Sequence, residues 1–192
     1  NGDQINAGAR PCSPTQTDNS NKSTLRSITG KTGEVVNVIC SPGYSGGGIW
    51  SCEDNGAFTG TSCSANSCTP TQIANSNKST EGSVSGRTGD KIRVTCDAGY
   101  TGGGDWTCET NGTFSGSSCT PNSCTPTQVA NSNKSSAGSI TGTTGSTFTI
   151  NCDTNFTGGG VWTCGADGNF TGAGCTYVDP GPQNISFAIN NG

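Results

Sequence analysis

The sequence contains no histidine and no methionine, and only 11% of its 192 residues are charged. Without histidine, the usual base of a catalytic triad and the commonest metal ligand are both missing. The formal charge of −4, with few basic residues, argues against nucleic acids and anionic membranes as partners. No apolar run approaches the length of a membrane span. These absences argue against a histidine-based catalytic or metal site, a nucleic-acid binder and a membrane-spanning segment.

The chain is rich in cysteine and is built from repeated segments. The segments CSPGYSGGGIWSC, CDAGYTGGGDWTC and CDTNFTGGGVWTC begin at Cys40, Cys96 and Cys152, a spacing of 56 residues both times. A constant period of this size indicates a tandem array. We predict an N-terminal extension over 1–11, repeats over 12–63, 68–119 and 124–175, and a C-terminal tail over 176–192. Linkers of only four residues, SANS and TPNS, separate the repeats.

Each repeat is too short for a large core, and only 28% of the chain is hydrophobic. Domains of this size usually depend on disulfides or metal ions. The 12 cysteines fall into three sets of four at intervals of 28, 12 and 11 residues, which is not the paired spacing of a zinc site. We therefore predict disulfides, a secreted or cell-surface location, and neither metal nor cofactor. Spacing alone leaves three possible pairings in each repeat.

The second half of each repeat alternates as a half-buried strand does. The residues expected to face inward are Val36, Val38, Cys40, Ile92, Val94, Cys96, Phe148, Ile150 and Cys152, with Phe58, Phe114 and Phe170 as later inward aromatics. The glycine run is predicted to connect two strands and to leave room for the neighbouring tryptophan over its bare backbone. A phosphate-binding loop would instead open a helix and carry a lysine.

The order of these features resembles the sushi domain, also called the complement control protein module. VNVICSPGY, IRVTCDAGY and FTINCDTNF match the region of the family's second cysteine, and NGAF, NGTF and DGNF stand where the family has G-x-W. The TGGG and SGGG elements, and the tryptophan before the third cysteine, depart from the family pattern. The resemblance implies an all-β fold of small disulfide-stapled modules in a linear tandem array. It also implies pairing of the first cysteine with the third and the second with the fourth, which gives Cys12–Cys52, Cys40–Cys63, Cys68–Cys108, Cys96–Cys119, Cys124–Cys164 and Cys152–Cys175.

No polar constellation recurs as a catalytic site would require. Asp97 and Asp153 correspond in the second and third repeats, but Ser41 stands at that position in the first. Calcium loops of the D-x-D-x-D-G type are missing as well. We therefore predict that the chain is not an enzyme and has no catalytic residue.

The most faithfully repeated polar segment is NSNKS. Two interpretations stay open, a polar turn and an N-glycosylation site, because each copy contains an N-x-S sequon. Seven sequons are no excess in a chain so rich in Asn, Ser and Thr. A secreted chain nevertheless makes covalent glycans an expected partner. The candidate positions are Asn21, Asn77, Asn133, Asn111, Asn155, Asn169 and Asn184.

The tail after Cys175 does not repeat. Its residues Ile185, Phe187 and Ile189 alternate with polar or small residues, which predicts a strand over 184–190 that has no sheet of its own. Such a strand needs a partner, so it either begins a further domain or is donated to a neighbouring copy. Donation would join subunits head-to-tail and grow a filament.

Our leading hypothesis is a non-enzymatic structural subunit of an extracellular, glycosylated fibre or cell-surface coat, whose main partner is itself. The alternative is an extracellular adhesion or recognition module that binds a protein or a glycan. Tryptophans exposed in register in all three repeats would favour glycan binding.

Overall fold

The structure is a computed structural model that describes residues 8–179 and residue 181. The described residues form two compact units, one within 1–95 and 103–118, the other within 96–102 and 119–192. Strands are the regular elements of both, which confirms the predicted all-β, disulfide-stapled fold class. The boundary between the units passes through the second repeat, so the three repeat ranges remain a prediction.

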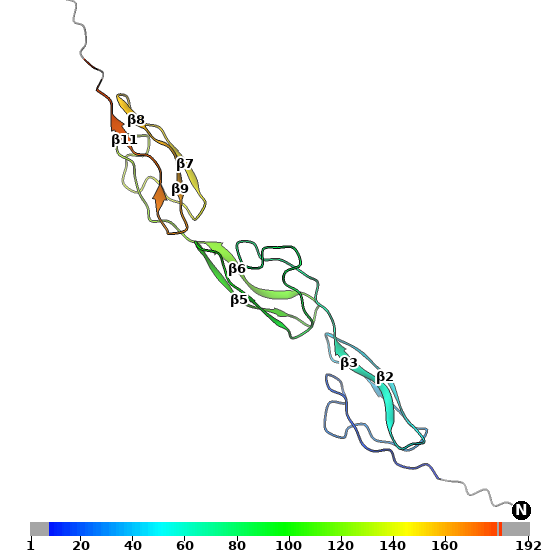
Figure 1. The fold of residues 1–192 in the computed structure, drawn as a ribbon. Helices are drawn as coiled ribbons and strands as arrows, with labels where there is room; N and C mark the ends of the chain where they lie inside the picture. The colour runs from blue at the N-terminus through cyan, green and yellow to red at the C-terminus, as the bar shows by residue number, and fades with distance from the viewer. Residues whose placement is uncertain (1–7, 180, 182–192) are drawn as a thin grey trace, which may run out of the picture. The chain divides into compact units, whose positions relative to one another are not determined.

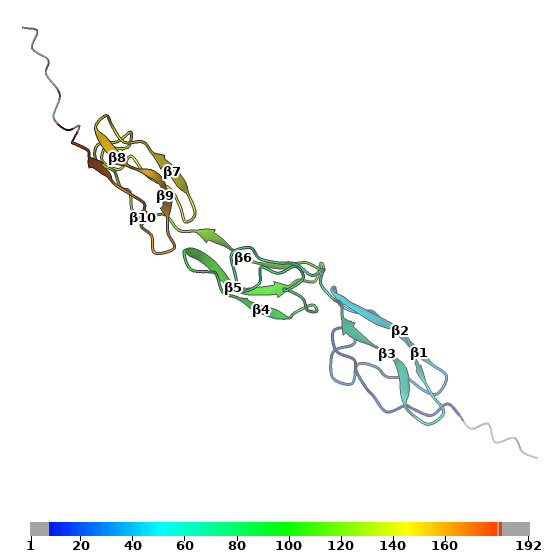
Figure 2. The same ribbon diagram turned by 45° about the horizontal axis from the view of Figure 1, so that its top comes forward.

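The first unit contains an antiparallel sheet in the order β1-β2-β3. Its strands are β1 (Val35–Val38), β2 (Tyr44–Cys52) and β3 (Phe58–Ala65), which Figure 2 shows side by side. The same order recurs in β4 (Lys91–Val94), β5 (Tyr100–Cys108) and β6 (Phe114–Pro121). The repeated sequence pattern therefore produces the same sheet twice.

The second unit contains two small sheets, whose strands are labelled in Figures 1 and 2. One has the order β10-β9-β7 and is made of β7 (Thr147–Ile150), β9 (Gly160–Cys164) and β10 (Phe170–Thr171). The other pairs β8 (Phe156–Gly158) with β11 (Cys175–Tyr177). The long middle strand of the earlier repeats is thus interrupted in the third one, at Gly159.

The alternation predicted for the strands is confirmed by burial. In β1, Val36 is half-buried and Val38 is buried, whereas Val35 and Asn37 are exposed. The corresponding strands β4 and β7 have the same burial pattern. The resulting cores are small, and that of the first repeat centres on Ile28, Val38 and Trp50. Cores of this size leave much of the stability to covalent links.

Those links are six disulfides, which join Cys12–Cys52, Cys40–Cys63, Cys68–Cys108, Cys96–Cys119, Cys124–Cys164 and Cys152–Cys175. These are the pairs implied by the sushi resemblance. In every repeat the first bridge spans 40 residues and the second spans 23. The longer bridge therefore ties the irregular first half of the repeat to the end of its middle strand.

The glycine run differs from the prediction in the first unit. Gly46, Gly47 and Gly48 do not connect two strands but lie inside β2, where its register with β3 shifts. All three have positive φ, at 111°, 67° and 88°. A Cβ on Gly47 would lie 2.6 Å from the Val38 carbonyl oxygen. The run is therefore a bulge that allows close approach to the neighbouring strand. In the third repeat it does separate two strands.

The tryptophan covers a different glycine from the one predicted. A Cβ on Gly60, which lies in β3, would fall 2.3 Å from the Trp50 ring. Gly116 and Gly172 have the same relation to the tryptophans of their own repeats. The Trp50 Nε1 also donates to the Thr61 carbonyl at 3.1 Å. The ring thus lies across the adjacent strand rather than over the glycine run, because this strand supplies both a bare backbone and an acceptor.

Candidate interaction surface

The candidate site with the clearest departure from the repeat is the outer face of β1 and β2 in the first repeat. We define this outer face as Val35, Asn37, Ile39, Ile49 and Ser51. Three of these side chains are aliphatic and more than half exposed, at 58% for Val35, 60% for Ile39 and 58% for Ile49. The register of β1 and β2 pairs Val35 with Ser51 and Asn37 with Ile49. The aliphatic side chains therefore occupy neighbouring and diagonal positions on one face of the sheet.

The second repeat carries charges at the corresponding positions. Lys91, Arg93 and Asp105 stand where the first repeat has Val35, Asn37 and Ile49. The Arg93 Nη1 lies 3.3 Å from the Asp105 Oδ1, and both side chains are exposed. A solvated charge pair of this kind contributes little stability but keeps the sheet face hydrated.

The third repeat is intermediate between the other two. Thr147, Thr149 and Asn151 replace Val35, Asn37 and Ile39, and Val161 is the remaining exposed aliphatic side chain on this face. The same sheet therefore carries an aliphatic, a charged and a polar outer surface in turn. Since the fold tolerates all three, the aliphatic surface of the first repeat is not required for folding.

Sequence reasoning missed this surface. It looked for polar groups that recur in register, whereas the informative signal is an outward position that changes from charged to aliphatic between copies. The signal is visible when VVNVI (35–39) is compared with KIRVT (91–95). Strand alternation assigns both Val35 and Lys91 to the outside, and one is aliphatic where the other is charged.

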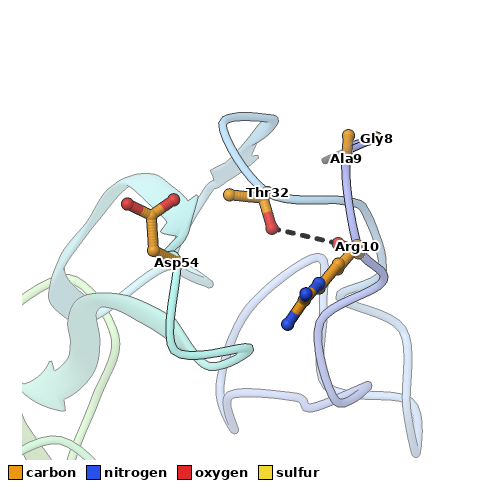
Figure 3. Close-up of a pocket in the computed structure, with 5 residues that line it drawn as sticks. All are labelled: Gly8, Ala9, Arg10, Thr32 and Asp54. Atoms are coloured by element: carbon orange, nitrogen blue, oxygen red, sulfur yellow. Dashed lines mark hydrogen bonds between the residues drawn. The ribbon is translucent and has the colours of Figure 1, made fainter. Parts of the chain in front are cut away.

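A second candidate is an open hollow of about 370 Å³ near the start of the described chain. Gly8, Ala9, Arg10, Thr32 and Asp54 line it. Figure 3 shows Arg10 and Asp54 on different sides, with the Thr32 hydroxyl donating to the Arg10 carbonyl at 3.2 Å. One guanidinium and one carboxylate offer charges of both signs but no nucleophile paired with a base.

In the second repeat, the position that corresponds to this hollow is occupied by residues of the first repeat. Thr88, the counterpart of Thr32, donates from its hydroxyl to the Gly43 carbonyl at 2.9 Å within the first unit. A Cβ on Gly43 would lie 2.9 Å from the Thr110 Cα, so only glycine fits there. In the second unit Thr144 makes the same bond to Gly99 at 2.8 Å. These positions therefore serve the contacts between successive repeats.

The tryptophans do not form an exposed series. Trp50 is 8% exposed, and Trp106 and Trp162 are half-buried. Each indole nitrogen already donates to a backbone carbonyl. A shallow hollow of about 210 Å³ lies beside Trp106 and Phe114, with Thr69, Pro70, Thr71 and Thr113 as its other lining residues. The rings act in packing and do not form the exposed series of tryptophans that would favour glycan binding.

Six of the seven sequon asparagines lie among the described residues, and all six are exposed: Asn21, Asn77, Asn133, Asn111, Asn155 and Asn169. The seventh, Asn184, lies outside the described residues, as do Ile185, Phe187 and Ile189 of the predicted assembly strand. The structure therefore locates the sequons on the surface and does not describe the predicted strand.

The repeated sequon also has a structural part to play. The Asn77 Oδ1 accepts from the Thr95 amide at 2.9 Å, and the Asn77 amide donates to the Thr95 carbonyl at 3.0 Å. The preceding Ser76 is buried, and its hydroxyl donates to the Ile73 carbonyl at 2.7 Å. NSNKS is thus a hydrogen-bonded turn whose asparagine side chain ties it to the end of a strand.

Asn169 is bonded differently. Its Nδ2 donates to the Asp167 Oδ2 at 3.1 Å, and its amide donates to the Asp167 Oδ1 at 3.1 Å. These hydrogen bonds lower the pKa of the Asp167 carboxyl from its ordinary value, because they stabilise the ionised form. A glycan on Asn169 would replace one of the two hydrogens of that Nδ2. Glycosylation at this sequon would therefore compete with the hydrogen bond to Asp167.

Residues 8–179 and 181 lack two kinds of feature. No helix long and apolar enough to cross a membrane occurs in this part of the chain. No group of three or more His, Cys, Asp or Glu side chains suited to hold a metal ion occurs there either.

Comparison with known proteins identifies one segment. Residues 68–124 match the family model described as the Sushi repeat, or SCR repeat. The segment that includes the predicted middle repeat thus matches the sushi family, which confirms the resemblance from which the disulfide pairing was predicted. None of the curated proteins searched matches the chain significantly. Sushi repeats are in general non-enzymatic modules of extracellular or cell-surface proteins that mediate recognition and adhesion.

Proposed function

We propose that this chain, with its central sushi repeat, is a structural subunit of an extracellular fibre or cell-surface coat built from its own copies. The observation that carries the proposal is the apolar sequence after the last cysteine. Tyr177 and Val178 are 60% and 47% exposed, and Ile185, Phe187 and Ile189 follow in alternation. Exposed apolar side chains in series need a covering partner.

The chemistry of the described residues supports a structural role. Their acidic side chains are dispersed, and their cysteines are consumed in disulfides. Short linkers and contacts such as Thr88 to Gly43 connect successive repeats, which suits a load-bearing array. A subunit with one tail strand and one receptor for it polymerises head-to-tail, because the two surfaces differ.

The first test is negative-stain electron microscopy of the full chain beside a chain truncated after Asp179, which keeps β11 and its pairing with β8. We expect filaments from the full chain and none from the truncated chain, since truncation removes every residue of the predicted assembly strand. Single particles in both preparations would contradict polymerisation.

That contradicting result would favour the alternative, an adhesion or recognition module for another protein. The outer face of the first repeat supports this second candidate, because Val35, Ile39 and Ile49 form an apolar surface that the second repeat lacks. The two functions differ in one measurable property, since only a self-assembling subunit changes its size with its own concentration.

We also propose that the chain is N-glycosylated on the repeated sequon. We expect peptides containing Asn21, Asn77 and Asn133 to carry glycan when the chain is secreted from a eukaryotic host, because all three are exposed. Mass spectrometry after peptide N-glycosidase treatment measures this as conversion of Asn to Asp. The matched control is Ser79→Ala, which destroys one sequon but keeps the Asn77 hydrogen bonds. Unmodified peptides at all three positions would contradict the proposal.

A further inference from the structure

We propose that the receptor for the tail strand is the outer face of β1 and β2 in the first repeat of a second copy. This inference rests on the proposed self-assembly and names the surface that performs it. The occupant is the segment 184–190 of this chain, which lies outside the described residues.

The apolar series of the tail and that of the outer face have the same length in sequence. The alternating tail residues Ile185, Phe187 and Ile189 span five positions, and so do Val35 and Ile39 on the receptor. A strand rises about 3.3 Å per residue, so each series extends over about 13 Å. Ile49 widens the receptor face by one strand, since it lies opposite Asn37.

Neither the outer face of the first repeat nor the tail segment has charged side chains. The segments 35–39 and 47–51 contain no charged side chain, and neither does the tail from 182 to 192. The second repeat presents Lys91, Arg93 and Asp105 on the same face, and burying them under an apolar strand would cost their hydration. The third repeat offers Val161 alone among polar side chains. The first repeat is therefore the one whose outer face suits an apolar, uncharged strand.

The edge beyond β1 is unsuited to the addition of a strand. The edge of the chain beyond β1 is already paired at Ile39, whose amide donates to the Asn21 Oδ1 and whose carbonyl accepts from the Asn21 amide, both at 2.9 Å. Addition of a strand at this edge would have to break both bonds. The tail therefore packs its side chains across the face rather than extending the sheet.

The receptor variant takes its residues from the second repeat, where the fold already carries them. Val35→Lys, Asn37→Arg and Ile49→Asp together reproduce the Lys91, Arg93 and Asp105 surface, including its charge pair. The matched control is Val161→Asp, an equally exposed aliphatic position in the third repeat. Far-ultraviolet circular dichroism before and after heating verifies that both variants are folded.

Sedimentation velocity over a hundredfold range of concentration measures assembly. We expect the full chain and Val161→Asp to grow into polymers, while the triple variant and the chain truncated after Asp179 stay monomeric. A mixture gives the decisive result. The truncated chain has the receptor without the tail, and the triple variant has the tail without the receptor, so together they should form a one-to-one dimer.

Polymers from the triple variant, with none from the truncated chain, would overturn the receptor assignment and leave the tail-driven fibre standing. The same holds if both are monomeric but their mixture fails to dimerise. A full chain that stays monomeric at every concentration would overturn both proposals.

Discussion

Removal of the Cys12–Cys52 disulfide by substitution of both cysteines with alanine is expected to unfold the first repeat and leave the third folded. The bridge closes a segment of 40 residues, for which the chain-entropy model gives about 4 kcal/mol at room temperature. A core of this size supplies no more than a few kcal/mol, roughly 3–5 even for a full small domain. Ile28, Val38 and Trp50 are the buried residues of that core. Loss of the bridge therefore removes about as much free energy as the repeat has.

Hydrogen exchange followed by mass spectrometry reads each repeat separately. Peptides from 12–63 should lose protection, whereas peptides from 124–175 should keep it. The matched control removes Cys40–Cys63, which spans 23 residues and for which the same model gives about 3 kcal/mol. Both of its cysteines are half-buried, whereas Cys12 and Cys52 are buried. Full protection of the first repeat without Cys12–Cys52 would show that its hydrogen-bonded turns contribute more to the free energy of unfolding than we expect.

The sequence predicted the inward positions of β1, β4 and β7 correctly, because burial alternates with a period of two along a strand. Val36 and Val38 point inward as expected, and the same holds for Ile92 and Val94. The disulfide pairs needed more than spacing, since spacing left three pairings open and only the family resemblance chose among them. The sushi match over 68–124 then supported that choice.

The glycine run and the tryptophan were harder to place for a physical reason. A glycine tolerates positive φ in a turn and in a bulge alike, so the residue type does not say which is formed. Only the neighbouring strand decides, through the closeness of the Val38 carbonyl to Gly47. Sequence proximity suggested the glycine run as the backbone beneath Trp50, whereas its hydrogen-bond acceptor, the Thr61 carbonyl, lies on β3.

The outer face of the first repeat escaped prediction because nothing in the fold determines it. Outward positions of these strands hold lysine, threonine or valine with the same sheet beneath them. A residue that folding does not constrain is free to serve binding, and so departures between copies are more informative here than agreements. The agreements, such as Ser76 and its buried hydroxyl in NSNKS, describe how each repeat folds.

Gly47→Ala is expected to destabilise the first repeat far more than Gly48→Ala, although the two glycines are neighbours and both have positive φ. Each substitution incurs the strain of an L residue in left-handed backbone, about 1–2 kcal/mol. Gly48 has open space where its Cβ would be, so the strain is its whole cost. At Gly47 the Cβ would lie 2.6 Å from the Val38 carbonyl oxygen and 3.1 Å from the Cys40 Sγ.

Neither of those neighbours of Gly47 is free to move, because the Val38 carbonyl belongs to β1 and the Cys40 sulfur is held in a disulfide. Relief of such overpacking costs about 1–3 kcal/mol more, so we expect a total near the stability of the repeat. Denaturant titration of hydrogen exchange in the 12–63 peptides compares the two variants directly. Equal loss of protection in the two variants would mean that positive φ alone explains why glycine occupies these positions. A larger loss at Gly47 would show that the bulge exists to bring β2 within contact of β1 and of the disulfide.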